Sequence, residues 1–194
     1  MLRDRVTALF SGDSNYHFNH QWQDWQQISN QIKVAVMASE DQTFPTHHGF
    51  NLTAMQKAWE YNRKGRRIHG GSTISQQVAK NLYLWPGTSY LRKGIEAYLT
   101  VLIEIAWPKQ RILEIYLNSA EFGYGVFGVE AASQRFFHKP AAKLSAREAA
   151  LLAAVLPSPK RYLVDRPSSY IKARQAWILR QMSLLGGTSA LNRL

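Results

Sequence analysis

Apolar residues recur three or four positions apart through most of this 194-residue chain, and prolines or glycines interrupt the pattern at intervals. Such spacing places apolar side chains on one face of an α-helix, whereas a half-buried strand would alternate apolar and polar residues. Alternation of that kind is scarce, and no internal repeat or low-complexity tract is present. The pattern predicts a mainly α-helical chain with short connectors, long enough for one domain with a substantial core.

Capping residues and chain breakers predict where each helix begins and ends. The predicted helices end at about Glu40, run from Asn51 to near Gly65, from Thr73 to about Leu84, from Ser89 to Pro108 and onward from Pro108, and cover 129–137, 145–156 and 170–185. The helix after Ser89 carries a wide apolar stripe, made by Leu91, Ile95, Tyr98, Leu102 and Ile105. This stripe predicts that it is the central core helix.

The chain is strongly basic, with 24 Lys and Arg against 13 Asp and Glu and a net charge of +11. Such an excess predicts an anionic partner: nucleic acid, an anionic membrane surface or a phosphorylated substrate. Because cysteine is absent, disulfides, thiol nucleophiles and thiolate metal sites are excluded. No apolar run reaches the roughly 18 residues of a transmembrane helix, and the sequence does not begin with a signal-peptide pattern.

A glycine pair followed by a capped helix forms the first candidate site. Residues 70–81 read Gly-Gly-Ser-Thr-Ile-Ser-Gln-Gln-Val-Ala-Lys-Asn, in which Ser72 or Thr73 can cap the helix. Ile74, Val78 and Leu82 recur at i, i+4 and i+8 and are predicted to face a core. The opposite side presents four hydrogen-bond donors, Gln76, Gln77, Lys80 and Asn81. The segment fits a phosphorylated, sugar-like ligand at a helix N-terminus, and equally well an ordinary capped surface helix.

Two clusters of charged residues flank this segment in the sequence. Glu40 and Asp41 lie at the predicted end of the first helix, where the negative end of the dipole favours proton uptake and suits a general base. Arg92, Lys93 and Glu96 are spaced to share one surface of a later helix. Alone, a Glu-Asp pair is more commonly a fraying helix end with solvated acids, and the spacing of the second cluster more commonly gives a solvated surface salt bridge worth under about 1 kcal/mol.

Taken together, these clusters resemble the peptidoglycan glycosyltransferases of glycosyltransferase family 51, in particular the monofunctional biosynthetic transglycosylases of Gram-negative bacteria. The resemblance runs from about Ile28 to about Gly187. The matching motifs, in the family's order, are Glu40-Asp41-x-x-Phe44-x-x-His47-x-Gly49, Gly71-Ser72-Thr73-Ile74-x-Gln76-Gln77-x-x-Lys80-Asn81, Arg92-Lys93-x-x-Glu96, Lys109-x-x-Ile112-Leu113-x-x-Tyr116-Leu117-Asn118 and Phe122-Gly123-x-Gly125-x-x-Gly128-Val129-x-Ala131-Ala132. The family implies a lysozyme-like glycosyltransferase fold.

The resemblance implies polymerisation of lipid II. A lipid-linked glycan strand with undecaprenyl pyrophosphate on its anomeric carbon is the donor, and a sugar 4-hydroxyl of another lipid II is the acceptor. Glu40 matches the family's catalytic base, and Glu96 matches its second essential acid. His47 is expected to form structural hydrogen bonds beside Glu40. The remaining matched positions are predicted to bind substrate: Asp41, Phe44, His47, Ser72, Thr73, Gln76, Gln77, Lys80, Asn81, Arg92 and Lys93.

Cofactors, partners and location follow from the same resemblance. Glu96 is a candidate ligand for a divalent cation, Mg²⁺ or Mn²⁺, bound together with the pyrophosphate, and no organic cofactor is expected. The basic run Arg63, Lys64, Arg66 and Arg67 follows an apolar helix face, which predicts either contact with an anionic membrane or a core helix with a solvated tail. The expected location is the periplasmic face of the bacterial inner membrane, with other cell-wall synthases as candidate partners and no nucleic acid.

The resemblance also divides the chain into an N-terminal arm (1–27), without the membrane-spanning helix that usually begins such enzymes, and a glycosyltransferase domain (28–194).

Thr88 stands where we would align an arginine of the relatives, so one pyrophosphate contact is expected to be missing. The glycine loop 123–128 is expected either to approach the sugar chain or to permit a tight helix junction. Three rival functions are a glycan-cleaving lysozyme-like enzyme, a module that binds nucleic acid or membrane, and a noncatalytic scaffold.

Overall fold

A computed structural model describes residues 18–63, 71–85, 87 and 89–194. In the order of the chain, the elements are β1 (Asn19–His20), η1 (Trp25–Gln27), α2 (Asn30–Glu40), α3 (Leu52–Arg63), α4 (Ile74–Tyr83), α5 (Tyr90–Ala106), α6 (Lys109–Ser119), β2 (Glu121–Gly123), β3 (Val126–Phe127), α7 (Val129–Phe137), η2 (Ala141–Lys143), α8 (Ala146–Val155), α9 (Ser169–Leu184) and η3 (Gly187–Arg193). The mainly α-helical class is therefore confirmed.

Three predicted helix starts are confirmed by their caps. The side chains of Thr73, Ser89 and Ser145 each accept a hydrogen bond from a backbone N–H in the first turn of α4, α5 and α8. Thr73 and Ser145 also form complete capping boxes, with Gln76 and Glu148. Sequence alone had left Ser72 and Thr73 as alternative caps of α4, and the structure selects Thr73.

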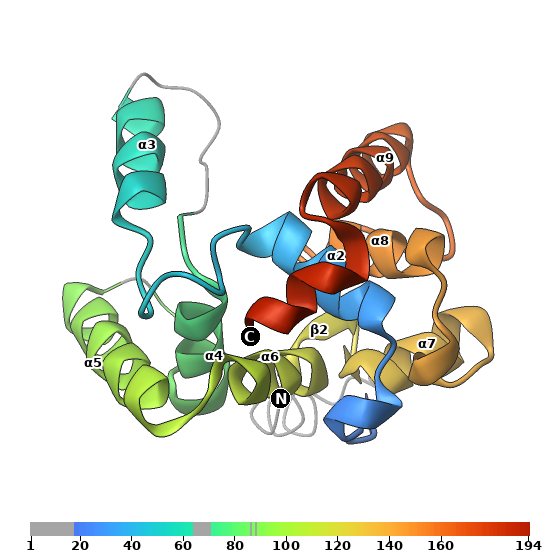
Figure 1. The fold of residues 1–194 in the computed structure, drawn as a ribbon, viewed down its shortest axis with the longest axis horizontal. Coiled ribbons are helices and arrows are strands. Elements are labelled where there is room, and N and C mark those ends of the chain that lie inside the picture. Colours follow the sequence, from blue (N-terminus) through green and yellow to red (C-terminus); the bar gives the residue numbers. More distant parts are fainter. Residues whose placement is uncertain (1–17, 64–70, 86, 88) are drawn as a thin grey trace.

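Helix α2 is the central core helix. Every residue from Ile32 to Ala38 is buried, because α8, α9 and η3 pack around it. Figure 1 shows this group on one side of the molecule, with α4 and α5 on the other and α6 running between them. Helix α3 projects away from both groups. The C-terminal end of α2 therefore lies near the place where the two groups meet.

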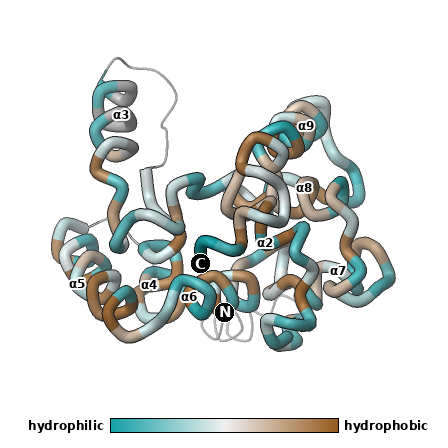
Figure 2. The backbone as a smooth tube through the Cα atoms, viewed as in Figure 1, coloured by the Kyte–Doolittle hydropathy of each residue, from teal (hydrophilic) through white to brown (hydrophobic). Residues whose placement is uncertain are grey.

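The prediction that α5 forms the centre of the core is wrong. Its buried side chains are Arg92, Glu96, Thr100 and Ile103, whereas Leu91, Tyr98 and Ile105 are 73%, 65% and 79% exposed. The polar residues recur at i, i+4 and i+8 and form the face that packs toward α4. The apolar stripe consequently faces outward, and Figure 2 shows hydrophobic residues along this outlying helix.

A small sheet and the N-terminal arm lie next to α6. Strand β3 pairs with β1 in parallel and with β2 antiparallel, in the order β1-β3-β2. The Asn118 side chain of α6 accepts a hydrogen bond from the backbone N–H of Gln23 (2.8 Å) and donates to its carbonyl (2.9 Å). Glu114 accepts from the Trp25 N–H at 2.6 Å. The described part of the arm is thus attached to α6.

The glycine loop contains the turn between β2 and β3 and the junction that starts α7. Gly128 has φ +83°, and a Cβ there would lie 2.8 Å from the Asn118 carbonyl oxygen. A side chain at this position is excluded both by the backbone conformation and by the neighbouring helix. Of the two expectations for this loop, the structure supports the tight helix junction at Gly128.

Candidate active site

The Glu40 carboxylate lies at the end of α2 with hydrogen-bond donors on both of its oxygens. Gln77 Nε2 of α4 donates to Oε2 at 3.1 Å, and the hydroxyl of Ser39 donates to Oε1 at 3.0 Å. Arg174 of α9 approaches Oε1 with its Nη2 at 3.7 Å. Three elements distant in sequence therefore converge on one carboxylate, and their contacts fix its orientation.

The orientation of Gln77 is itself set by Tyr116 of α6. The Tyr116 hydroxyl donates to Gln77 Oε1 at 3.1 Å, which leaves the amide N–H₂ of Gln77 for Glu40. Burial raises the pKa of Tyr116 well above its usual value, and the negative charge of Glu40 raises it further. The hydroxyl therefore remains protonated and acts as a donor. Sequence analysis placed Tyr116 in a motif but assigned it no role.

Asp41 and His47 connect the end of α2 to the start of α4. Asp41 Oδ2 accepts from His47 Nε2 (2.7 Å) and from the backbone N–H of Ile74 (3.1 Å). Because the Gly49 N–H donates to His47 Nδ1, the imidazole carries its proton on Nε2. A carboxylate at the N-terminus of α4 also complements the helix dipole. The structural role expected for His47 is confirmed in this contact.

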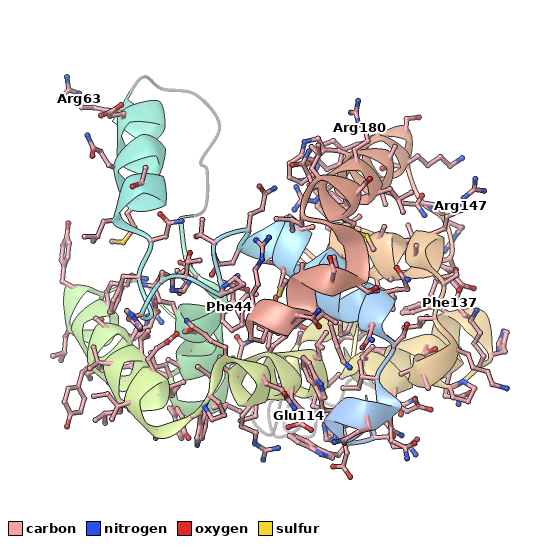
Figure 3. The ribbon with its side chains drawn as sticks, in the orientation of Figure 1. Phe44, Arg63, Glu114, Phe137, Arg147 and Arg180 are labelled. Carbon is pink, nitrogen blue, oxygen red and sulfur yellow. The ribbon has the colours of Figure 1, made fainter. Side chains whose placement is uncertain are left out.

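Three of the residues predicted to bind substrate lie in the connection after α2: Asp41, Phe44 and His47. Asp41 is buried and paired with His47, whose side chain is 8% exposed, and Phe44 is completely buried in the core. Figure 3 shows Phe44 between the two groups of helices. The structure gives all three residues a part in positioning α2 and α4, and their direct contact with a substrate stays a prediction.

The predicted polar face of α4 divides into buried and exposed residues. Thr73 and Gln76 are buried, because each is used in the capping box of the helix. Gln77 contacts Glu40, and Lys80 and Asn81 lie three and four residues further along the same face. Ser72, Lys80 and Asn81 are exposed and remain open to a ligand. Ile74 and Val78 are buried as predicted, but the prediction that Leu82 faces the core is wrong, because Leu82, in the last turn of the helix, is 42% exposed.

Glu96 forms a buried ion-pair cluster with the two cations of its motif. Arg92 Nη1 lies 3.2 Å from one carboxylate oxygen, and Lys93 Nζ contacts the other. Glu96 and Arg92 are buried, whereas the Lys93 side chain is 48% exposed. Among the described residues, Arg92 Nε is buried without a hydrogen-bond partner. The cluster can present two positive groups to an anion while Glu96 holds them in place.

The same geometry does not suit Glu96 as a ligand of a resident metal ion. Both of its oxygens are engaged by cations, which would compete with a metal for the carboxylate. In the part of the chain that the structure describes, no group of three or more His, Cys, Asp or Glu side chains could hold a metal ion. The divalent cation therefore stays a prediction.

The Glu104 carboxylate joins α4, α5 and α6, and sequence analysis missed it. Glu104 of α5 accepts a hydrogen bond from Ser75 of α4 and pairs with Lys109 at the start of α6 (2.7 Å). Both charged side chains are mostly buried. In the sequence, Glu104 only interrupts an apolar run, so no signal marked it as a junction of three helices.

Comparison with known proteins identifies the family. The transglycosylase family model matches residues 7–183. Proteins described as biosynthetic peptidoglycan transglycosylases from Cronobacter sakazakii and Klebsiella oxytoca are 59% and 58% identical, over 96% of this chain and 78% of each relative. The corresponding protein of Citrobacter koseri is 56% identical over 100% of this chain and 80% of its own. The chain therefore belongs to the transglycosylase family.

Proposed function

We propose that this protein is a peptidoglycan glycosyltransferase that polymerises lipid II into linear glycan strands for the bacterial cell wall. The proposal rests on one observation above all. Glu40, the residue that matches the family's base, is a carboxylate held from two sides and faces the polar surface of α4. The high identity to relatives described as peptidoglycan transglycosylases supports the same conclusion.

In the proposed reaction, Glu40 accepts the proton of the acceptor's 4-hydroxyl as that oxygen attacks the anomeric carbon of the donor. The new C1–O4 bond forms as the bond from C1 to the pyrophosphate breaks, and the pyrophosphate leaves with the bonding electrons. Attack opposite the leaving group inverts the anomeric centre. The products are a strand longer by one disaccharide unit and undecaprenyl pyrophosphate.

Cations near the site would stabilise the charge that develops on the leaving group. Lys80 is exposed on the face of α4 that also carries Gln77, and Arg92 and Lys93 are gathered around Glu96 on the neighbouring α5. Thr88, the position at which an arginine contact was expected to be missing, lies outside the described residues. The basic cluster favours this reaction over simple glycan cleavage, which needs an acid and a sugar groove but no pyrophosphate site.

We also propose that the outward apolar side of α5 contacts the bilayer that carries the substrate. Tyr90, Leu91, Tyr98 and Ile105 are exposed, and so are Leu52 and Met55 on α3. Arg63 lies at the far end of α3 (Figure 3), and the predicted basic residues Lys64, Arg66 and Arg67 lie outside the described residues. No helix in the described ranges is long and apolar enough to cross a membrane. The exposed apolar side chains fit surface contact at the periplasmic face of the inner membrane.

A polymerisation assay tests the function directly. Purified protein is incubated with lipid II in detergent, and with lipid II in vesicles, and glycan strands are separated by size. The Glu40→Gln variant is the control, because its amide cannot accept the proton, and it should lose about 10²–10⁴-fold in rate. Release of small fragments from purified cell-wall sacculi, without polymerisation, would favour the glycan-cleaving enzyme. Lack of both activities would favour the scaffold.

A further inference from the structure

Helix α9 brings a cation to the proposed base, although it carries none of the five motifs. Arg174 Nη2 lies 3.2 Å from the Ser39 hydroxyl oxygen and 3.7 Å from Glu40 Oε1. The Ser39 hydroxyl in turn contacts Glu40 Oε1 at 3.0 Å and the Ala153 carbonyl at 3.3 Å. A hydroxyl has a single hydrogen, and the contact with Glu40 is the shorter of the two. Arg174 therefore reaches the carboxylate both directly and through Ser39.

Burial makes this contact different from an ordinary surface ion pair. The side chain of Arg174 is 22% exposed and that of Glu40 is 13% exposed, so water screens the pair less than it would at the surface. Gln77 holds the other carboxylate oxygen from α4. Loss of Arg174 would leave Gln77 on one carboxylate oxygen and, on the other, a serine without its charged partner.

The guanidinium group of Arg174 has one N–H donor that is not used by any described residue. In the described part of the chain, Arg174 Nε is buried and has no hydrogen-bond partner. Nε and Nη2 share one edge of the guanidinium group, and this is the edge that already contacts Ser39. A small movement of the Glu40 carboxylate toward this edge would add a hydrogen bond from Arg174 to Glu40. Contacts of catalytic groups commonly tighten in this way when the substrate binds.

We propose that Arg174 is a positioning residue for Glu40, which it holds together with Ser39 in the orientation that accepts the acceptor's proton. The inference rests on the proposed function, because it gives Arg174 a role only if Glu40 acts as the base. It gives helix α9 a part in the reaction, although Arg174 lies outside the motifs of α2, α4 and α5.

Steady-state kinetics with lipid II test the proposal. Arg174→Gln should lower kcat about 10–100-fold and leave KM within about twofold, because a misplaced group slows the chemical step without weakening uniform binding. Arg174→Lys should recover part of the loss. The control is Arg180→Gln, which removes the same charge from an exposed position of α9 and should match the wild type. Figure 3 shows Arg180 pointing away from the molecule.

An unchanged kcat in Arg174→Gln would overturn the inference. If KM were raised at the same time, Arg174 would be a substrate contact. The double variant Glu40→Gln, Arg174→Gln gives a second test. If Arg174 acts through Glu40, the double variant should retain the residual rate of Glu40→Gln within about twofold, and a further loss of 10–100-fold would contradict this.

Thermal unfolding of each variant shows whether it is folded. If Arg174→Gln does not fold, Arg174→Lys and Ser39→Ala decide the question, and each should lower kcat several-fold at unchanged KM. Normal kcat in both would overturn the inference. A wild-type protein that does not polymerise lipid II would refute the proposed function itself, which is a separate outcome.

Discussion

Tyr116 shows how a buried side chain can act on a site that it does not reach. Its hydroxyl donates to Gln77, and this bond decides which end of the Gln77 amide faces Glu40. Without the hydroxyl, Gln77 Oε1 loses its donor, and the side chain of Gln77 is less firmly held in the position from which it donates to Glu40. The residue thus affects Glu40 through one intermediate side chain.

Tyr116→Phe should therefore lower both stability and turnover. The lost hydrogen bond leaves Gln77 Oε1 without its donor, which should reduce the free energy of unfolding by about 1–3 kcal/mol. Polymerisation should fall by about tenfold, because Glu40, the proposed base, is less well held. Urea denaturation and the lipid II assay measure the two effects. Tyr162→Phe, a change in the loop before α9, is the matched control. Full turnover in Tyr116→Phe would show that Gln77 needs no orientation by Tyr116.

Lys80 differs from Tyr116 in that it is exposed, and this separates its effects on folding and on activity. Lys80→Ala should change the free energy of unfolding by no more than about 0.5 kcal/mol. Its polymerisation rate should fall on the order of 10²-fold, since a cation at the leaving pyrophosphate would be lost. Lys172→Ala, an exposed lysine on α9, is the control for charge. Normal polymerisation by Lys80→Ala would remove Lys80 from the proposed pyrophosphate site.

At the scale of elements, α5 explains why periodicity predicted the wrong core helix. An apolar stripe identifies the face that avoids water, but it does not say whether another helix or a lipid covers that face. Here the face toward α4 is polar, because Arg92, Glu96 and Thr100 occupy it. Helix α2 has no comparable stripe, since it is buried on all sides, and its sequence therefore gave a weaker signal than α5.

If α5 contacts the bilayer, polar substitutions on its outer face should weaken membrane binding without unfolding the protein. Leu91→Ser with Ile105→Ser removes two side chains that are 73% and 79% exposed. Each buried aliphatic side chain contributes about 1.5–3 kcal/mol, so vesicle binding should fall by two orders of magnitude or more. Sedimentation with vesicles that contain anionic lipid measures the binding of the variant and of the wild type.

The control for this experiment lies on α9. Leu184 is also 79% exposed, so Leu184→Ser removes a similar apolar surface from a different face of the molecule. It should leave vesicle binding unchanged. Equal loss in both variants would mean that binding depends on general surface hydrophobicity, and no loss in either would exclude α5 as the contact.

At the scale of the whole molecule, the motifs predicted the residues of the site better than their arrangement. The caps of α4, α5 and α8 could be predicted because they depend on residues three positions apart. The contact between Arg174 and Glu40 could not, because it joins residues 134 positions apart in the chain and depends on how α9 packs against α2. The same is true of Glu104, whose partners lie on two other helices.

The C-terminal helix η3 is another feature that periodicity did not predict, since the last helix was expected to stop at Gly186 and Gly187. After these glycines the chain turns, and η3 packs against α2 with Ala190 buried. Helices α8 and α9 cover other sides of α2. The end of the chain therefore completes the enclosure of the helix that carries Glu40.

Ala190→Asp tests this role, because it places a carboxylate without a partner in the contact between η3 and α2. A buried unpaired charge is among the most destabilising changes known, and we expect a loss of about 3–5 kcal/mol in the free energy of unfolding. Thr188→Asp introduces the same charge at an exposed position of η3 and should cost less than about 0.5 kcal/mol. Urea denaturation of both variants measures the difference. Equal stability would mean that η3 detaches from α2 at little cost, and that α8 and α9 alone suffice to hold Glu40 in place.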